Sequence, residues 1–418
     1  MAALAGCSEP EPETASTTTA PSAETGDCAA DLLACAREST LGDLVPDEPT
    51  EATGEPIVLG MINQDNTPAA SFPELSQADQ AAVEFINEQL GGVGGRPLEL
   101  LVCNTQFSTE GSAACGQQMV EASVPAVLGG IDVFGTAIDT LADNGIPYVG
   151  GIPVSTQSMT DPLSFQWSGG TWGATIAFAD HAINEVDADR VSILYGEFGS
   201  IEDSAEYGQR VLEEAGVEVQ MVPYPIMSTD ISSPLQAAAA TDPDALIVLA
   251  ADTGCKPAYD GVAALGLDAT TYVVGACVAP TILADVGDAS EGAVFNVEGP
   301  ISTAGPVPDV TLYSAVIDEY GDGLDAAGAG TVSFRSLMNL YAVMVDLGPD
   351  AVTAEAIVDA LRAKVDAPSF MGHPYTCDGE QLAGLPATCS PQQILGQIVD
   401  GELTQITDWI QVGEIYPG

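Results

Sequence analysis

The sequence predicts an α/β fold with two lobes, each a parallel sheet flanked by helices. Two observations carry this prediction. Residues 55–106 have the order strand, loop, helix, strand of a βαβ unit, whose crossover makes the two strands parallel. Short apolar strands then alternate with helices, and the alternation starts again after residue 170, which indicates a second sheet.

The opening unit has the clearest pattern. Ile57 to Ile62 is a short apolar run typical of a buried strand. Beyond a polar loop, Ser71 and Glu74 have the spacing of a capping box. Apolar residues from Leu75 to Leu90 recur at helical spacing and predict a helix with one buried face, which the glycines from Gly91 end.

The same signals predict the remaining elements in order. In the first lobe we expect strands over 97–103, 124–130 and 146–151 and helices over 109–122 and 134–144. In the second lobe we expect strands over 190–195, 217–222, 245–250 and 271–275 and helices over 171–185, 201–215, 234–240 and 256–265. A crossing segment over 300–310, helices over 331–346 and 353–364, and a hairpin-like run over 394–412 complete the chain.

The charge of the chain excludes some partners. Lys and Arg total 8 against 61 Asp and Glu, a formal net charge of -53. Such a field repels nucleic acid, so no nucleic-acid partner is expected. A solvated acidic surface explains the charge without any ligand, and the charge alone identifies none.

Eight of the nine cysteines fall into close pairs, which predicts four disulfides in an oxidising compartment. The pairs are Cys28 with Cys35, Cys103 with Cys115, Cys255 with Cys277, and Cys377 with Cys389. None has the CxxC spacing of a metal site, and the two histidines stand apart, so no metal is expected. On a regular helix the first pair would lie about 10 Å apart, whereas a disulfide needs Cα atoms within roughly 7 Å. Either that segment is bent or the pair is not bonded.

The ninth cysteine, Cys7, follows Leu-Ala-Gly in a stretch that resembles the lipobox of bacterial lipoproteins. There the cysteine carries the lipid and becomes the N-terminus; chance in an Ala/Gly-rich stretch is the alternative. A secretion signal needs a basic region and a longer apolar core, so we expect the true start to lie elsewhere. Residues 8–27 have little to bury and are expected to form a disordered tether. These features predict an extracytoplasmic, lipid-anchored protein.

The opening stretch also resembles a known family. A loop ending in A-S-F, a helix reading A-A-V-E-F-I-N, a G-G-V-G-G-R turn and a strand reading L-E-L-L-V look like the start of type I periplasmic binding proteins. These are the leucine/isoleucine/valine-binding receptors of ABC importers. The likeness extends weakly along most of the chain from about Glu55. It implies a cleft between the lobes, a small-molecule ligand, an ABC importer permease as partner and no cofactor.

The resemblance further implies lobes that are discontinuous in sequence. Residues 1–54 would be lipobox, acidic tether and linker, 55–170 the first part of lobe 1, and 171–299 the first part of lobe 2. Residues 300–364 would return to lobe 1, and 365–418 would be the C-terminal part of lobe 2. Periodicity alone does not predict this division.

Ligands of open parallel sheets bind beyond the carboxyl ends of the strands, so the candidate residues lie in those loops. Phe72 falls where the family places an aromatic residue over the ligand, and Phe198 resembles the tyrosine of the family's second-lobe wall; ordinary packing is the alternative for each. The other candidates are Ile131, Asp132, Val133, Ile152, Pro153, Ser155, Glu197, Asp252, Thr253 and Val278.

The candidate loops differ from those of amino-acid binders in the family. Such binders place small hydroxyl residues in the loop that here holds Ile131, Asp132 and Val133, and near the position of Val278 they place an acidic residue that pairs with the ligand's ammonium group. Asp252 or Glu197 would supply that charge, unless they are solvated acids. These departures disfavour an ordinary α-amino acid ligand.

An enzyme would need a nucleophile with its base, a metal cluster or a phosphate loop, and no such motif is present. We therefore expect a monomeric, non-enzymatic binding protein for a small polar metabolite, amino acid or amide-like. Delivery to an ABC importer is the first interpretation, and ligand sensing for a membrane receptor is the alternative. The sequence does not separate the two.

Overall fold

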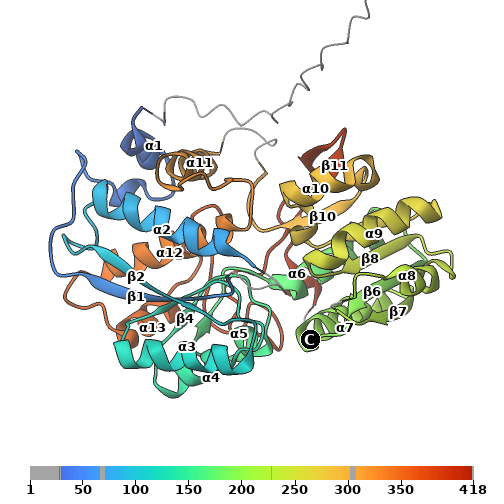
Figure 1. Ribbon diagram of the computed structural model, residues 1–418, viewed down its shortest axis with the longest axis horizontal. Helices are drawn as coiled ribbons and strands as arrows, with labels where there is room; N and C mark the ends of the chain where they lie inside the picture. The colour runs from blue at the N-terminus through green and yellow to red at the C-terminus, as the bar shows by residue number, and fades with distance from the viewer. Residues whose placement is uncertain (1–27, 29, 66–70, 227, 302–306, 417–418) are drawn as a thin grey trace, which may run out of the picture.

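The computed structural model describes residues 28, 30–65, 71–226, 228–301 and 307–416, and its strands form two sheets in two lobes (Figure 1). The sheet of lobe 1 has five strands in the order β2-β1-β3-β4-β5, all parallel to their neighbours. Its strands are β1 (Ile57–Asn63), β2 (Leu98–Asn104), β3 (Val127–Gly129), β4 (Tyr148–Val149) and β5 (Ser164–Phe165). The parallel sheet predicted for this lobe is confirmed.

The sheet of lobe 2 has seven strands in the order β12-β11-β10-β9-β8-β6-β7. Its strands are β6 (Arg190–Gly196), β7 (Glu218–Tyr224), β8 (Ala245–Leu249), β9 (Thr270–Val273), β10 (Val294–Val297), β11 (Ile394–Val399) and β12 (Glu402–Gln405). β11 runs antiparallel to both β10 and β12, so this sheet is mixed rather than wholly parallel. The reason is the tight turn at Asp400 and Gly401, since two strands joined by a short hairpin must be antiparallel.

Helices cover both faces of each sheet. Lobe 1 carries α2 (Pro73–Glu88), α3 (Thr109–Ala122), α4 (Thr136–Asp143), α5 (Thr156–Thr160), α11 (Pro308–Tyr320), α12 (Gly330–Leu347) and α13 (Ala354–Arg362). Lobe 2 carries α6 (Gly170–Asn184), α7 (Gly199–Glu214), α8 (Ser232–Ala239), α9 (Asp252–Leu265), α10 (Pro280–Val286) and α14 (Val412–Ile415), with short 3₁₀ turns η2 (Gly275–Val278) and η3 (Gly287–Ser290). No helix within the described ranges is long and apolar enough to cross a bilayer.

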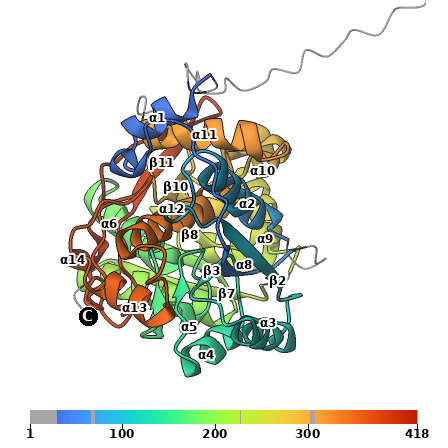
Figure 2. The same ribbon diagram turned by 90° about the vertical axis from the view of Figure 1, so that its left-hand side faces the viewer.

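Helix α2 shows how sequence and packing agree. Its buried face includes Leu75, Ala82 and Ile86 at the predicted spacing, and it packs against α11 and α12. Figure 2 shows α12, in orange, beside α2 although more than two hundred residues separate them. The helix begins at Pro73 with Phe72 as N-cap, one residue beyond the Ser71 that the capping-box spacing predicts. Proline suits this first position because its fixed φ is already helical and its missing N–H is not needed.

The chain crosses between the lobes three times: from β5 to α6, from β10 to α11, and from α13 to β11. Helices that follow lobe 2 in sequence thus pack on lobe 1, and the last two strands complete the sheet of lobe 2. The exact division at residues 54, 170, 299 and 364 stays a prediction.

All four predicted disulfides are present, with Cα atoms 5.5, 5.5, 5.2 and 4.4 Å apart in chain order. The first pair is bonded because its segment is bent. Asp31 caps α1 (Leu32–Glu38), so Cys28 lies before the helix that carries Cys35. Cys7, the predicted lipidation site, lies outside the described residues.

Candidate functional site

The buried amide of Asn63 holds together two loops of the predicted ligand site. Asn63 ends β1 and is fully buried. Its Oδ1 accepts the N–H of Ile131 at 3.1 Å, and its Nδ2 donates to the carbonyl of Phe72 at 2.8 Å. A Cβ on Gly130 would overlap this amide, so the close approach of the two loops requires glycine there. The structure therefore brings Phe72 and Ile131, two predicted ligand contacts, to one place.

The side chain of Asp132 is buried in lobe 1, next to the start of α4. Only 2% of the residue is exposed. Its carboxylate accepts the hydroxyl of Ser112 at 2.6 Å and the N–H of Phe134 at 3.2 Å, and Ser112 Oγ accepts the N–H of Ala137 at 2.9 Å. Burial raises the pKa of Asp132, and these hydrogen bonds act in the opposite direction. Ligand contact by Asp132, and by the half-buried Val133, stays a prediction.

The loop after β4 lies against the loop after β3. The N–H of Ile152 donates to the carbonyl of Gly130 at 3.0 Å. Ile152 is half-buried, whereas Pro153 and Ser155 are buried. Ser155 is the N-cap of α5, and its Oγ accepts the N–H of Ser158 at 3.3 Å. The loop is thus fixed by its own hydrogen bonds, and its ligand contacts stay predictions.

The candidates in lobe 2 lie at three separate places along the carboxyl edge of its sheet. Glu197 is exposed and follows β6, and the half-buried Phe198 next to it is the N-cap of α7. Asp252 begins α9, and Thr253 beside it is exposed. Val278, 8% exposed, packs in the apolar core of lobe 2.

Two contacts join the lobes at these edges. The ring centroids of Phe198 and Phe134 lie 6.5 Å apart with an interplanar angle of 80°, and Phe134 also packs 5.6 Å from Phe107. The hydroxyl of Ser200 donates to the carbonyl of Val154. The sequence analysis did not name Phe107 and Phe134, each of which lies four residues beyond a predicted strand, because their contacts with one another and with Phe198 come from separate segments.

The three chain crossings meet at one carboxylate, that of Glu298. Its Oε1 accepts the hydroxyl of Ser168 at 2.7 Å, the N–H of Gly169 at 2.9 Å and the amide of Gln393 at 3.0 Å. Its Oε2 lies 3.0 Å from Nη2 of Arg335 on α12. Glu298 thus links the first, second and third crossings to a helix of lobe 1.

The sequence matches the profile of the family described as periplasmic binding protein over residues 56–383. The chain belongs to this family. The family consists of extracytoplasmic solute-binding proteins, which confirms the resemblance seen in the opening stretch.

Solved structures show the same fold at low sequence identity. A leucine-binding protein of Thermotoga maritima is 16% identical, with a TM-score of 0.70 over 84% of this chain and 98% of that one. A solute-binding protein of R. palustris, solved with 4-hydroxybenzoate, is 16% identical, with a TM-score of 0.69 over 85% and 96%. A fatty acid ABC transporter substrate-binding protein of Thermomonospora curvata is 17% identical, with a TM-score of 0.70 over 90% and 97%. None of the curated proteins matches the sequence.

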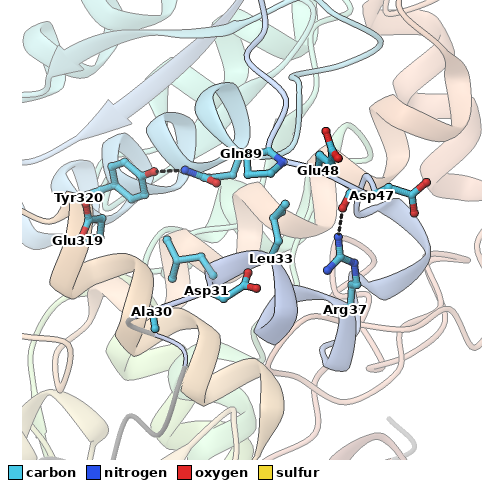
Figure 3. A pocket seen from close by; sticks show the side chains of 11 residues that line it. Ala30, Asp31, Leu33, Arg37, Asp47, Glu48, Gln89, Glu319 and Tyr320 are labelled. Atoms are coloured by element: carbon cyan, nitrogen blue, oxygen red, sulfur yellow. Dashed lines mark hydrogen bonds between the residues drawn. The ribbon is translucent and has the colours of Figure 1, made fainter.

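A cavity of about 410 Å³ in this periplasmic binding protein lies elsewhere, between α1, the segment after it and the ends of α2 and α11 (Figure 3). Gln89, which donates to the hydroxyl of Tyr320 at 3.0 Å, places this cavity at the C-terminal end of α2. A helix of 16 residues spans about 24 Å, so the cavity is far from Phe72 at the other end. Its one arginine, Arg37, is bound to the carbonyls of Pro46 and Asp47. This cavity is at the wrong edge of the sheet for the family's ligand site.

Proposed function

We propose that this protein is the ligand-binding receptor of an ABC importer and holds a small polar metabolite, amino acid or amide-like, between its lobes. The observation that carries the proposal is the meeting of the two carboxyl edges, where Phe134 of lobe 1 faces Phe198 of lobe 2. A ligand lodged among the loops after β1, β3, β4 and β6 would touch both lobes. Relatives that bind leucine and 4-hydroxybenzoate on the same fold support a small-molecule ligand.

The mechanism follows from a ligand that touches both lobes. Such a ligand binds the closed arrangement more tightly than the open one, so it shifts the population toward closure by that difference in affinity. The crossings at Glu298 would act as the hinge of this motion. The importer's permease would then recognise the closed form.

The site of membrane attachment is part of the same proposal. We assign it to a lipid on Cys7, supported by the lipobox-like residues before it. Intact-mass analysis of the protein purified from membranes should show the added lipid. The mass of an unmodified chain would contradict the assignment.

A thermal-shift screen of the purified soluble form tests the proposed function. A compound that binds only the native state raises the melting temperature by mass action. The panel should contain amino acids, amides, urea, polyamines, small carboxylates and aromatic acids at low and high salt. We expect one chemical class to raise the melting temperature in a saturable manner. A shift that is equal for all classes would contradict a selective receptor.

A further inference from the structure

All eight basic side chains of the chain belong to described residues, and none comes from a loop at the facing edges. They are Arg37, Arg96, Arg190, Arg210, Lys256, Arg335, Arg362 and Lys364. Arg96 and Arg190 lie at the amino ends of their sheets and bind backbone carbonyls there. Lys256, one turn into α9, is directed to Asp260 at 3.3 Å and to the carbonyl of Asp285. Arg335 is the one basic residue of the hinge, and Glu298 already pairs with it.

Carboxyl groups, in contrast, occur in or next to several of the facing loops. Asp65 follows β1 and is bound by Ser76 Oγ at 3.1 Å. Asp132 follows β3, Glu197 follows β6, and Glu298 lies at the hinge. With no unpaired cation on these loops and a chain charge of -53, the field between the lobes disfavours an anion.

Backbone N–H groups are the other means of binding a carboxylate, and three of those in the loops after β3 and β4 already have side-chain acceptors. The N–H of Phe134 is held by Asp132, and that of Ala137 by Ser112. The N–H of Ser158 is held by Ser155. These three donors lie at or just before the starts of α4 and α5, and because they have internal acceptors they are not available to a ligand anion.

The loops offer apolar surface instead. Phe134 and Phe198 face one another, and the half-buried Phe72, Ile152 and Val154 lie on the adjoining loops. A carboxylate placed against such surface would lose its hydration without a compensating partner. An uncharged group has a smaller cost of lost hydration, and for a cationic group the negative field offsets that cost.

From these contacts we propose that the site selects a neutral or cationic solute with an apolar body, such as an amide or an amine, and rejects compounds that carry a carboxylate. This inference rests on the proposed function and narrows it: the amide-like alternative is retained and the free amino acid is excluded. It assigns the discrimination to the N–H groups already held by Asp132, Ser112 and Ser155 and to the absence of a free cation from the facing loops.

The test is ligand capture from a mixed extract of small metabolites. The purified full chain is equilibrated with the extract, washed and denatured, and the released compounds are identified by mass spectrometry. The leucine-binding protein of Thermotoga maritima, treated identically, is the control for capture. We expect the compounds released from this chain to be neutral or cationic at pH 7 and to lack a carboxylate.

The other outcomes of the capture experiment contradict either the charge selectivity or the proposed function. Capture of an amino acid or another carboxylate would overturn the charge selectivity and leave the receptor function standing. Capture of nothing, while the control releases leucine, would overturn the proposed function. The captured compound is then compared with its own carboxylate analogue by calorimetry, where we expect at least about tenfold weaker binding of the analogue. Equal affinities would contradict the inference.

Discussion

The carboxylate of Glu298 lies 3.0 Å from the guanidinium of Arg335, and their side chains are only 12% and 4% exposed. A second guanidinium nitrogen of Arg335 donates to the backbone carbonyl of Glu298. Buried ion pairs are stable only where further hydrogen bonds compensate for lost hydration. Here the hydroxyl of Ser168 and the amide of Gln393 supply them. The Glu298–Arg335 pair therefore connects α12 of lobe 1 to the segments that cross between the two lobes.

Replacing Arg335 with methionine should destabilise the fold strongly. The change leaves the charge of Glu298 buried without its partner, which typically costs about 3–5 kcal/mol. Urea unfolding followed by circular dichroism gives the free energy of unfolding. The matched control is Lys364→Met, which breaks the 2.9 Å pair with the 61% exposed Asp346 and should cost no more than about 1 kcal/mol. Equal losses in the two variants would show that the hinge pair has no special role.

Asp79 predicts a pH dependence of stability. It is fully buried in α2, and neither carboxyl oxygen has a hydrogen-bond partner among the described residues. Burial raises its pKa well above the usual value, so the folded state favours the protonated form. Its contribution to stability is present below the unfolded-state pKa and is lost as pH rises toward the raised folded-state pKa.

Asp79→Asn removes this titration. We expect the variant to gain stability relative to the natural chain as pH rises from 4 to 8, measured by urea unfolding at each pH. The exposed Asp359, changed to asparagine, is the control for the same substitution at a surface position. A constant difference between the Asp79 variant and the natural chain across this range would contradict the assignment.

Phe198→Ala should weaken ligand binding without unfolding the protein. The side chain is half-buried and contacts the other lobe through Phe134, so its loss removes a wall of the site and leaves the core intact. We expect a rise of about tenfold in Kd, or ~1.4 kcal/mol, by calorimetry with the compound found by capture. Phe72→Ala should act in the same direction. Tyr320→Phe, which alters the distant cavity, should leave Kd unchanged. Unchanged affinity in both phenylalanine variants would refute the site.

Much of the fold was predictable because local signals and tertiary packing agree. The helix Thr109–Ala122 was predicted at its observed bounds, and the opening strand at Ile57 was predicted to within one residue at its end. α11 was missed, because the prolines around it indicated a crossing segment. The structure instead uses Pro308 at the first helical position and buries Leu312 and Val316 at helical spacing.

The site was less predictable for a physical reason. Loop positions follow from the parallel sheet, so Phe72 and Phe198 were found at the strand ends. Asn63 was missed because a polar residue ending an apolar strand gives no sign of its partners, which come from two other loops. Glu298 was missed because three segments distant in sequence meet at it. Side chains whose role depends on long-range contacts have no local pattern.

Hydrogen exchange with and without the captured ligand tests the central claim most directly. The account predicts that ligand slows exchange in both lobes, at residues 129–134 and 150–155 of lobe 1 and at 196–200 of lobe 2. Exchange around the cavity near Arg37 and Tyr320 should not change. Protection at that cavity, or protection of one lobe alone, would contradict a ligand held between the facing edges.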